Sequence, residues 1–140
     1  MARSAYKLLE IQQKHAIIPP GGYVLDLGCH PGAWLQVACQ AIGPRSKGGL
    51  VLGIDIQETT VPGRYTDDRV KVLHGDAREV DGTVWKSYAA RGLDVVLSGA
   101  SSGVVFWCLV SRSLVRSHNL TLSIVVVIVV LLLLVLLVVV

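Results

Sequence analysis

Short apolar runs, separated by polar and glycine-containing stretches, divide the first 98 residues of the chain. The runs are rich in Val, Leu and Ile and end near a glycine or a polar residue, which is typical of buried strands. The predicted strands are residues 23–27, 50–56, 70–73 and 93–98. Apolar residues at helical spacing predict helices at residues 4–16, 33–42 and 81–90.

This alternation of strands and helices predicts an α/β fold with a doubly wound parallel sheet. Four strands form an incomplete sheet of that kind. The strand at 93–98 would then lie at an edge of the sheet, with no partner identified for it. Residues 3–98 are therefore the predicted domain, and we expect nothing after Ser98 to belong to it.

The sequence changes character after Ser98. All ten acidic residues precede that point, and the last 17 residues consist of Val, Ile and Leu alone. Residues 99–119 are interpreted as a linker and residues 120–140 as a hydrophobic tail, long enough as a helix to span a bilayer of about 30 Å. Two origins stay open: a genuine membrane anchor, or sequence that replaces the second half of a truncated domain.

The formal charge of +3 is compatible with RNA binding but does not demonstrate it. Three cysteines without CxxC spacing suggest neither a zinc site nor a disulfide framework, so no metal is expected. Reduced thiols indicate an intracellular compartment. No signal or transit peptide is recognised at the start of the chain.

The first predicted strand leads into a loop with glycines at 28 and 32 and then into a helix. Gly28 allows a sharp turn after the strand, and Gly32 leaves one wall without a side chain. The spacing differs from the GxGxxG dinucleotide motif, so a pyrophosphate is not required. The amino-acid end of S-adenosylmethionine (SAM) would fit such a loop, although a purely structural loop is the alternative.

Two acidic residues follow the next strands. Asp55 ends the second strand, where a carboxylate can accept both ribose hydroxyls of a nucleoside, and Asp76 follows the third, where it could contact an adenine. Asp26 lies just inside the first strand. The alternative is that Asp55 and Asp76 cap turns, as Asp often does. Together with the glycine loop, the acids favour a nucleotide site.

Five motifs in this order resemble the FtsJ-like ribosomal RNA 2′-O-ribose methyltransferases, and more narrowly the mitochondrial large-subunit rRNA methyltransferase branch. They are Ala-Tyr-Lys-Leu-Leu-Glu-Ile at 5–11, Leu-Asp-Leu-Gly-Cys-His-Pro-Gly-Ala-Trp at 25–34, Gly-Ile-Asp-Ile at 53–56, Gly-Asp at 75–76 and Asp-Val-Val-Leu-Ser at 94–98. The resemblance covers residues 3–98. It implies a Rossmann-like SAM-dependent methyltransferase fold and a mitochondrial or other intracellular location.

The resemblance also implies site residues and a reaction, the transfer of a methyl group from SAM to a ribose 2′-hydroxyl of ribosomal RNA. Lys7 matches the first lysine of the family's Lys-Asp-Lys-Glu catalytic set, where it would help to deprotonate the hydroxyl. The implied cofactor-binding residues are Gly28, Gly32, Trp34, Asp55 and Asp76.

The chain departs from the family pattern at its catalytic side. Gly99 stands where the family has the aspartate that follows the serine, and no lysine or acid occurs after Ser98. We therefore expect a chain that keeps most of the SAM pocket and is catalytically impaired. The alternative from another class is a membrane-anchored, non-catalytic nucleotide- or RNA-binding module.

Overall fold

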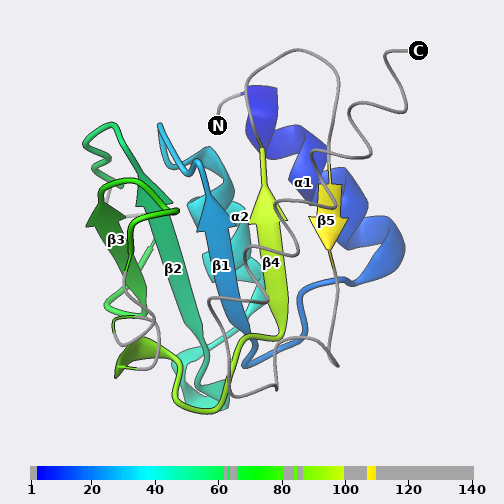
Figure 1. Cartoon of the computed structure of the whole chain (residues 1–140). Helices are drawn as coiled ribbons and strands as arrows, with labels where there is room; N and C mark the ends of the chain where they lie inside the picture. The colour runs from blue at the N-terminus through cyan, green and yellow to red at the C-terminus, as the bar shows by residue number, and fades with distance from the viewer. Residues whose placement is uncertain are drawn as a thin grey trace.

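The computed structural model of the chain describes residues 3–61, 63, 66–80, 84, 87–99 and 107–109. Figure 1 shows a sheet with two helices against one of its faces. The elements in chain order are α1 (Arg3–His15), β1 (Tyr23–Leu27), α2 (Ala33–Ala41), the 3-10 turn η1 (Arg45–Lys47), β2 (Leu50–Asp55), β3 (Val70–His74), β4 (Val95–Ser98) and β5 (Trp107–Leu109).

The strands form one sheet in the order β3-β2-β1-β4-β5. Strands β1 to β4 are mutually parallel, and their carboxyl ends meet at the top of the sheet in Figure 1. The parallel α/β fold predicted from the apolar runs is therefore confirmed. Each predicted strand lies within two residues of the observed one, and β1 matches at both ends.

The expectation that nothing after Ser98 belongs to the fold is wrong. Strand β5 pairs antiparallel with β4, and Ser98 lies opposite Trp107. The second neighbour of β4, on the side away from β1, is thus a three-residue strand from the segment after the recognised motifs. Its physical basis is backbone pairing across the sheet, which needs no particular side-chain pattern in so short a strand.

The two faces of the sheet have separate apolar cores. On one face, side chains of α1 and α2 such as Leu8 and Leu35 pack against Val24 and Val51 of the sheet. On the other face, Leu25 and its neighbours in β1, β2 and β4 pack with residues of the 77–93 segment. Alternation along β1 assigns Val24 and Asp26 to the helix-covered face.

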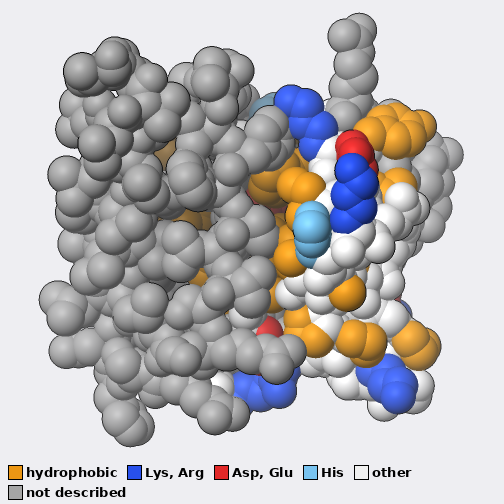
Figure 2. Space-filling model, turned by 90° about the vertical axis from the view of Figure 1, so that its right-hand side faces the viewer, with side chains coloured by type: hydrophobic (Ala, Val, Ile, Leu, Met, Phe, Trp, Pro, Cys, Tyr) orange, Lys and Arg blue, Asp and Glu red, His pale blue; other side chains and the backbone are white. Residues whose placement is uncertain are grey.

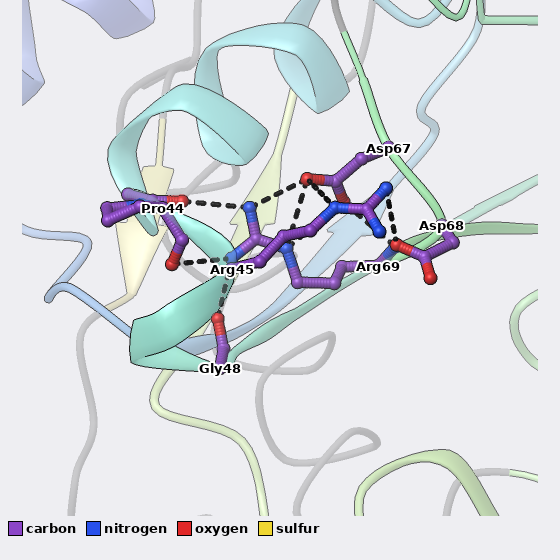
Figure 3. Close-up of polar contacts among 7 residues, drawn as sticks. Pro44, Arg45, Gly48, Asp67, Asp68 and Arg69 are labelled. Atoms are coloured by element: carbon purple, nitrogen blue, oxygen red, sulfur yellow. Dashed lines mark hydrogen bonds and ion pairs between the residues drawn. The ribbon is translucent and has the colours of Figure 1, made fainter.

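A polar cluster, drawn in Figure 3, joins the end of α2 to the start of β3. The guanidinium of Arg69 donates to both carboxylate oxygens of Asp67 at 2.8–3.2 Å. It also donates to the main-chain oxygens of Gly43 at 2.8 Å and Gly48 at 2.6 Å. The side chain of Arg69 is only 13% exposed. This cluster fixes the connection between α2 and β2 against the edge of the sheet.

Several sequence predictions fall partly or wholly on residues that the structure leaves out. Of the helix predicted at 81–90, Val84, Ser87 and Tyr88 are helical, and residues 81–83, 85 and 86 lie outside the description. Most of the predicted linker and the whole hydrophobic tail at 120–140 also lie outside it. Within the described residues, no helix combines the length and the apolar character needed to cross a membrane.

Candidate functional site

The loop between β1 and α2 is built on the backbone of Gly28 and Gly32, both of which have positive φ, 74° and 93°. The main-chain N–H groups of Gly28 and Cys29 donate to the main-chain oxygen of Ile54, so the loop is tied to the end of β2. A Cβ on Gly32 would lie 2.9 Å from a methyl carbon of Val61, so the absence of a side chain allows close packing there. Both glycines are needed for this path of the chain.

Asp55, at the end of β2, holds this loop in place. Its Oδ2 accepts the main-chain N–H of His30 at 2.8 Å, and its Oδ1 accepts that of Gln57, also at 2.8 Å. The carboxylate therefore organises both the glycine loop and the chain that leaves β2. Each carboxylate oxygen can accept a second hydrogen bond, so these contacts leave capacity for a ligand hydroxyl.

Asp76 lies two residues beyond β3, at the same edge of the sheet as Asp55. Its carboxylate accepts hydrogen bonds from the main chain and the guanidinium of Arg78, and the two side chains form an ion pair. These hydrogen bonds hold the pKa of Asp76 at about 2, so the group is charged at neutral pH. Arg78 itself is exposed, with 76% of its side chain accessible.

A cavity of about 70 Å³ opens between α1, the glycine loop, the start of α2 and the end of β4. It is far smaller than the roughly 300 Å³ or more of pockets that enclose a drug-sized ligand, so it would take one end of a larger molecule. The lining residues are Ser4, Asp26, Gly28, Cys29, His30, Pro31, Ala33, Trp34 and Gly99.

Asp26 is the buried acid of this cavity, with a relative exposure of 1%. Its Oδ2 has no hydrogen-bond partner within the part of the chain that the structure describes. Burial, followed by the charge of Asp55, raises the pKa of Asp26 to about 7. A buried, unpartnered carboxyl oxygen is costly to the fold unless a ligand supplies the missing donor.

Cys29 also lines the cavity, but its thiol has little reactivity. Burial, with the nearby charges of Asp26 and Asp55, raises the pKa of the Cys29 thiol to about 12. The thiol is therefore protonated at neutral pH and is a poor nucleophile or metal ligand. It acts as a small apolar wall beside Asp26.

Trp34 connects the three elements around the cavity. Its indole Nε1–H donates to the main-chain oxygen of Ser4 in α1 at 2.8 Å. Its ring lies against Gly99, where an added Cβ would come within 3.3–3.4 Å of three ring carbons. The indole thus joins the first turn of α1, the start of α2 and the segment after β4, and it occupies the space beside residue 99.

The structure places the residues predicted from the sequence in different parts of the site. Gly28 and Trp34 line the cavity directly. Asp55 and Asp76 lie at the ends of the neighbouring strands. Lys7 is exposed on α1, one turn after Ser4, and is not among the lining residues.

From the sequence, Asp26 counts among the acids near the strand ends but has no assigned role in the site, and Ser4 is not placed there at all. For Asp26 a signal existed, because an acid inside an otherwise apolar strand is unusual. For Ser4 there was none, since its place at the cavity depends on how α1 docks beside α2.

Comparison with known proteins supports the resemblance to the FtsJ-like methyltransferases. A family model described as FtsJ-like methyltransferase matches residues 1–129, which extends the resemblance beyond residue 98. The ribosomal RNA large subunit methyltransferase E of Desulfosudis oleivorans is 42% identical over 99 residues, covering 69% of this chain and 44% of that protein. The enzyme of the same name from Syntrophobacter fumaroxidans is 42% identical over 98 residues, 70% of this chain and 47% of that protein.

A solved structure has the same fold. The crystal structure described as a ribosomal RNA methyltransferase from Plasmodium falciparum matches with a TM-score of 0.60 at 24% identity. The match covers 89% of this chain and 68% of the other. By contrast, the chain spans less than half the length of the two curated relatives. Because the family match covers most of its length, the chain belongs to the FtsJ-like methyltransferase family.

Proposed function

We propose that this chain binds SAM at the carboxyl ends of β1, β2 and β4, as the methyl-donor side of a ribosomal RNA 2′-O-ribose methyltransferase. The observation that carries the proposal is the buried, unpartnered Oδ2 of Asp26, in a small cavity beside a glycine loop. Family membership supplies the reaction class, and the geometry of the site supports the position of the cofactor.

The amino-acid end of SAM carries an ammonium group, which is the donor that Asp26 lacks. An ammonium beside the carboxylate favours its charged form and offsets the burial of that charge. The cavity is large enough for one end of the cofactor, and Gly28 exposes backbone at its rim. The residues present therefore fit the group.

The nucleoside end would lie along the neighbouring strand ends. Asp55 would accept ribose hydroxyls with the capacity left after its two backbone contacts. Ile56, which is 69% exposed directly after Asp55, offers an apolar surface to the adenine. Asp76 would accept from the adenine amino group, in competition with Arg78.

The acceptor side is less complete in this chain. When bound, SAM would supply the methyl group, while the ribose hydroxyl must lose its proton. Lys7 would assist that loss from α1, as its match to the family implies. Gly99 provides no carboxylate, and the ring of Trp34 lies in the space beside it. We therefore expect cofactor binding without detectable methyl transfer by this chain alone.

The mitochondrial location and the membrane-anchored alternative stay predictions. The mitochondrial location rests on the resemblance of the motifs to one branch of the family. The alternative of a membrane-anchored binding module depends on residues 120–140, which lie outside the described part of the chain.

The test is to incubate the purified full chain with methyl-labelled SAM and ribosomal RNA, and to measure bound and transferred label separately. We expect bound label, reduced by Asp76→Ala, and no label in RNA ribose. No bound label from a folded chain would contradict the cofactor assignment. Label in ribose would contradict the stated role of Gly99 and show that the acceptor side is complete without a carboxylate there.

A further inference from the structure

The solvent side of α1 carries a large aromatic side chain. Tyr6 is 59% exposed, whereas Ala5 and Leu8 on the same helix are fully buried in the core. Among the described residues, the other exposed large apolar side chains are Ile56 at the site and Tyr88 at 37%. Tyr6 therefore presents an aromatic face to solvent that packing of α1 does not require.

Tyr6 lies on the helix that borders the candidate site through Ser4. Ser4, two residues earlier, lines the cavity, and its main-chain oxygen is bonded to Trp34. Lys7 follows Tyr6 directly. With a rise of about 1.5 Å and a rotation of about 100° per residue, Tyr6 is about 3 Å further along the helix than Ser4 and projects from nearly the opposite side of it. Its ring is thus outside the cavity and open to solvent, so it could contact a base of a bound RNA strand without entering the cavity.

The charge of α1 suits a polyanion. The basic residues of the helix whose side chains are described are Lys7, Lys14 and His15, and its first turn has no acid. The single acid, Glu10, is paired with Lys14 at 2.7 Å. Figure 2 faces this side of the molecule and shows basic side chains gathered beside an acidic one. Such a surface attracts phosphates but by itself reads no base.

We propose that Tyr6 is a stacking platform for one base of the single-stranded RNA whose ribose would accept the methyl group. An exposed aromatic ring beside a basic helix is the combination that binds single strands, because phosphates meet the charges and a base covers the ring. The inference rests on the proposed function, since it takes RNA as the substrate. It adds the residue that holds the strand.

The experiment measures the binding of a fluorescent single-stranded RNA of about ten nucleotides to the full chain by anisotropy. Loss of a stacked base typically weakens binding by about tenfold or more. We expect a weakening of about that size for Tyr6→Ala and Tyr6→Leu, and a change within about twofold for Tyr6→Phe, which keeps the ring. The leucine variant tests aromatic stacking separately from apolar contact.

Tyr88→Ala is the matched control. Tyr88 precedes Ala89, which packs in the core on the opposite face of the sheet from α1, so RNA affinity should stay within about twofold of the wild type. Because the phosphate contacts persist, the salt dependence of RNA binding should have the same slope in Tyr6→Ala as in the wild type. An RNA with abasic sites should bind the wild type as weakly as normal RNA binds Tyr6→Ala.

SAM binding by calorimetry on the same preparations separates the two proposals. Unchanged SAM affinity in Tyr6→Ala, with weaker RNA binding, supports the stacking role. RNA affinity that is equal in the wild type, Tyr6→Ala and Tyr6→Leu, or no RNA binding by the wild type, would overturn it while leaving the cofactor site intact. If the folded wild type binds RNA through Tyr6 but does not bind SAM, the proposed function fails and the stacking platform stands.

Discussion

Asp67 lies just before β3 and Asp26 lies inside β1, and the two carboxyl groups have opposite surroundings. Asp67 accepts three hydrogen bonds from the guanidinium of Arg69, which with further contacts to Arg69 and Arg45 holds its pKa at about 2. Asp26 is almost wholly buried, has an unpartnered oxygen and has its pKa raised to about 7. Within the described residues, the fold supplies hydrogen-bond donors to the carboxylate of Asp67 and none to Oδ2 of Asp26.

This difference distinguishes a structural charge from one that fits a ligand. The Asp67 cluster is complete within the chain, since its arginine also satisfies the main-chain oxygens of Gly43 and Gly48. Asp26 reduces stability as long as its oxygen has no donor. Removing a side chain from the Asp67–Arg69 cluster should therefore destabilise the fold. Neutralising Asp26 should stabilise the fold and weaken the binding of SAM.

The largest effect on stability is expected from Arg69→Ala. The substitution removes the donors to Asp67 and to two main-chain oxygens, and charged hydrogen bonds of this kind are worth about 2–4 kcal/mol when broken together. The measurement is the free energy of unfolding of the full chain in urea. Arg45→Ala is the control, because Arg45 is 66% exposed and its ion pairs should contribute about 1 kcal/mol or less. Equal effects of the two variants would contradict the structural role given to Arg69.

Asp26→Asn should raise the free energy of unfolding, whereas Arg69→Ala lowers it. The raised pKa means that folded Asp26 keeps a proton between pH 3.8 and about 7 that the unfolded chain has released, so its contribution to stability falls as pH rises through this window. The asparagine variant has no such slope and should exceed the wild type by at least about 1 kcal/mol at pH 8.

The check is a series of urea unfolding curves from pH 4 to pH 8. Asp68→Asn is the matched control substitution, because the side chain of Asp68 is 69% exposed. If the free energy of unfolding depends on pH in the same way in the wild type and in Asp26→Asn, the raised pKa of Asp26 is refuted. For Asp67 the expected sign is the reverse: its contribution is lost as pH falls toward 2.

Trp34→Phe should have the smallest effect on stability. The change removes the N–H that donates to Ser4 and keeps an aromatic ring beside Gly99, so the expected loss is about 1 kcal/mol. Hydrogen exchange should show faster opening of the first turn of α1, with little change in the sheet. Unchanged exchange in that turn would mean that the indole does not fix α1.

The sequence predicted the fold where local patterns carry the information. The apolar runs gave four strands, and the glycines at 28 and 32 marked the turn before α2. Strand β5 could not be predicted in this way, because a three-residue strand depends on the backbone of β4 being available beside it. The helix-to-strand contacts that complete the core follow from the same alternation that defined the strands.

The candidate site was predicted in part for the same reason. Asp55 stands at a strand end, where chain position alone indicates a ligand edge. The state of Asp26 depends on which donors surround it in three dimensions, and no local pattern records this. The position of Lys7 outside the cavity lining likewise follows from the docking of α1, which the sequence did not specify.

The central claim is that the Oδ2 of Asp26 receives the ammonium group of SAM, and one calorimetric comparison tests it directly. Full-length wild type and Asp26→Asn would each be titrated at pH 8 with SAM and with methylthioadenosine, which lacks the amino-acid end. A charged hydrogen bond lost in a buried site costs about tenfold or more in affinity. We predict that the wild type prefers SAM by at least that factor and that Asp26→Asn binds both ligands equally weakly. Equal SAM affinity in the two proteins would contradict the account.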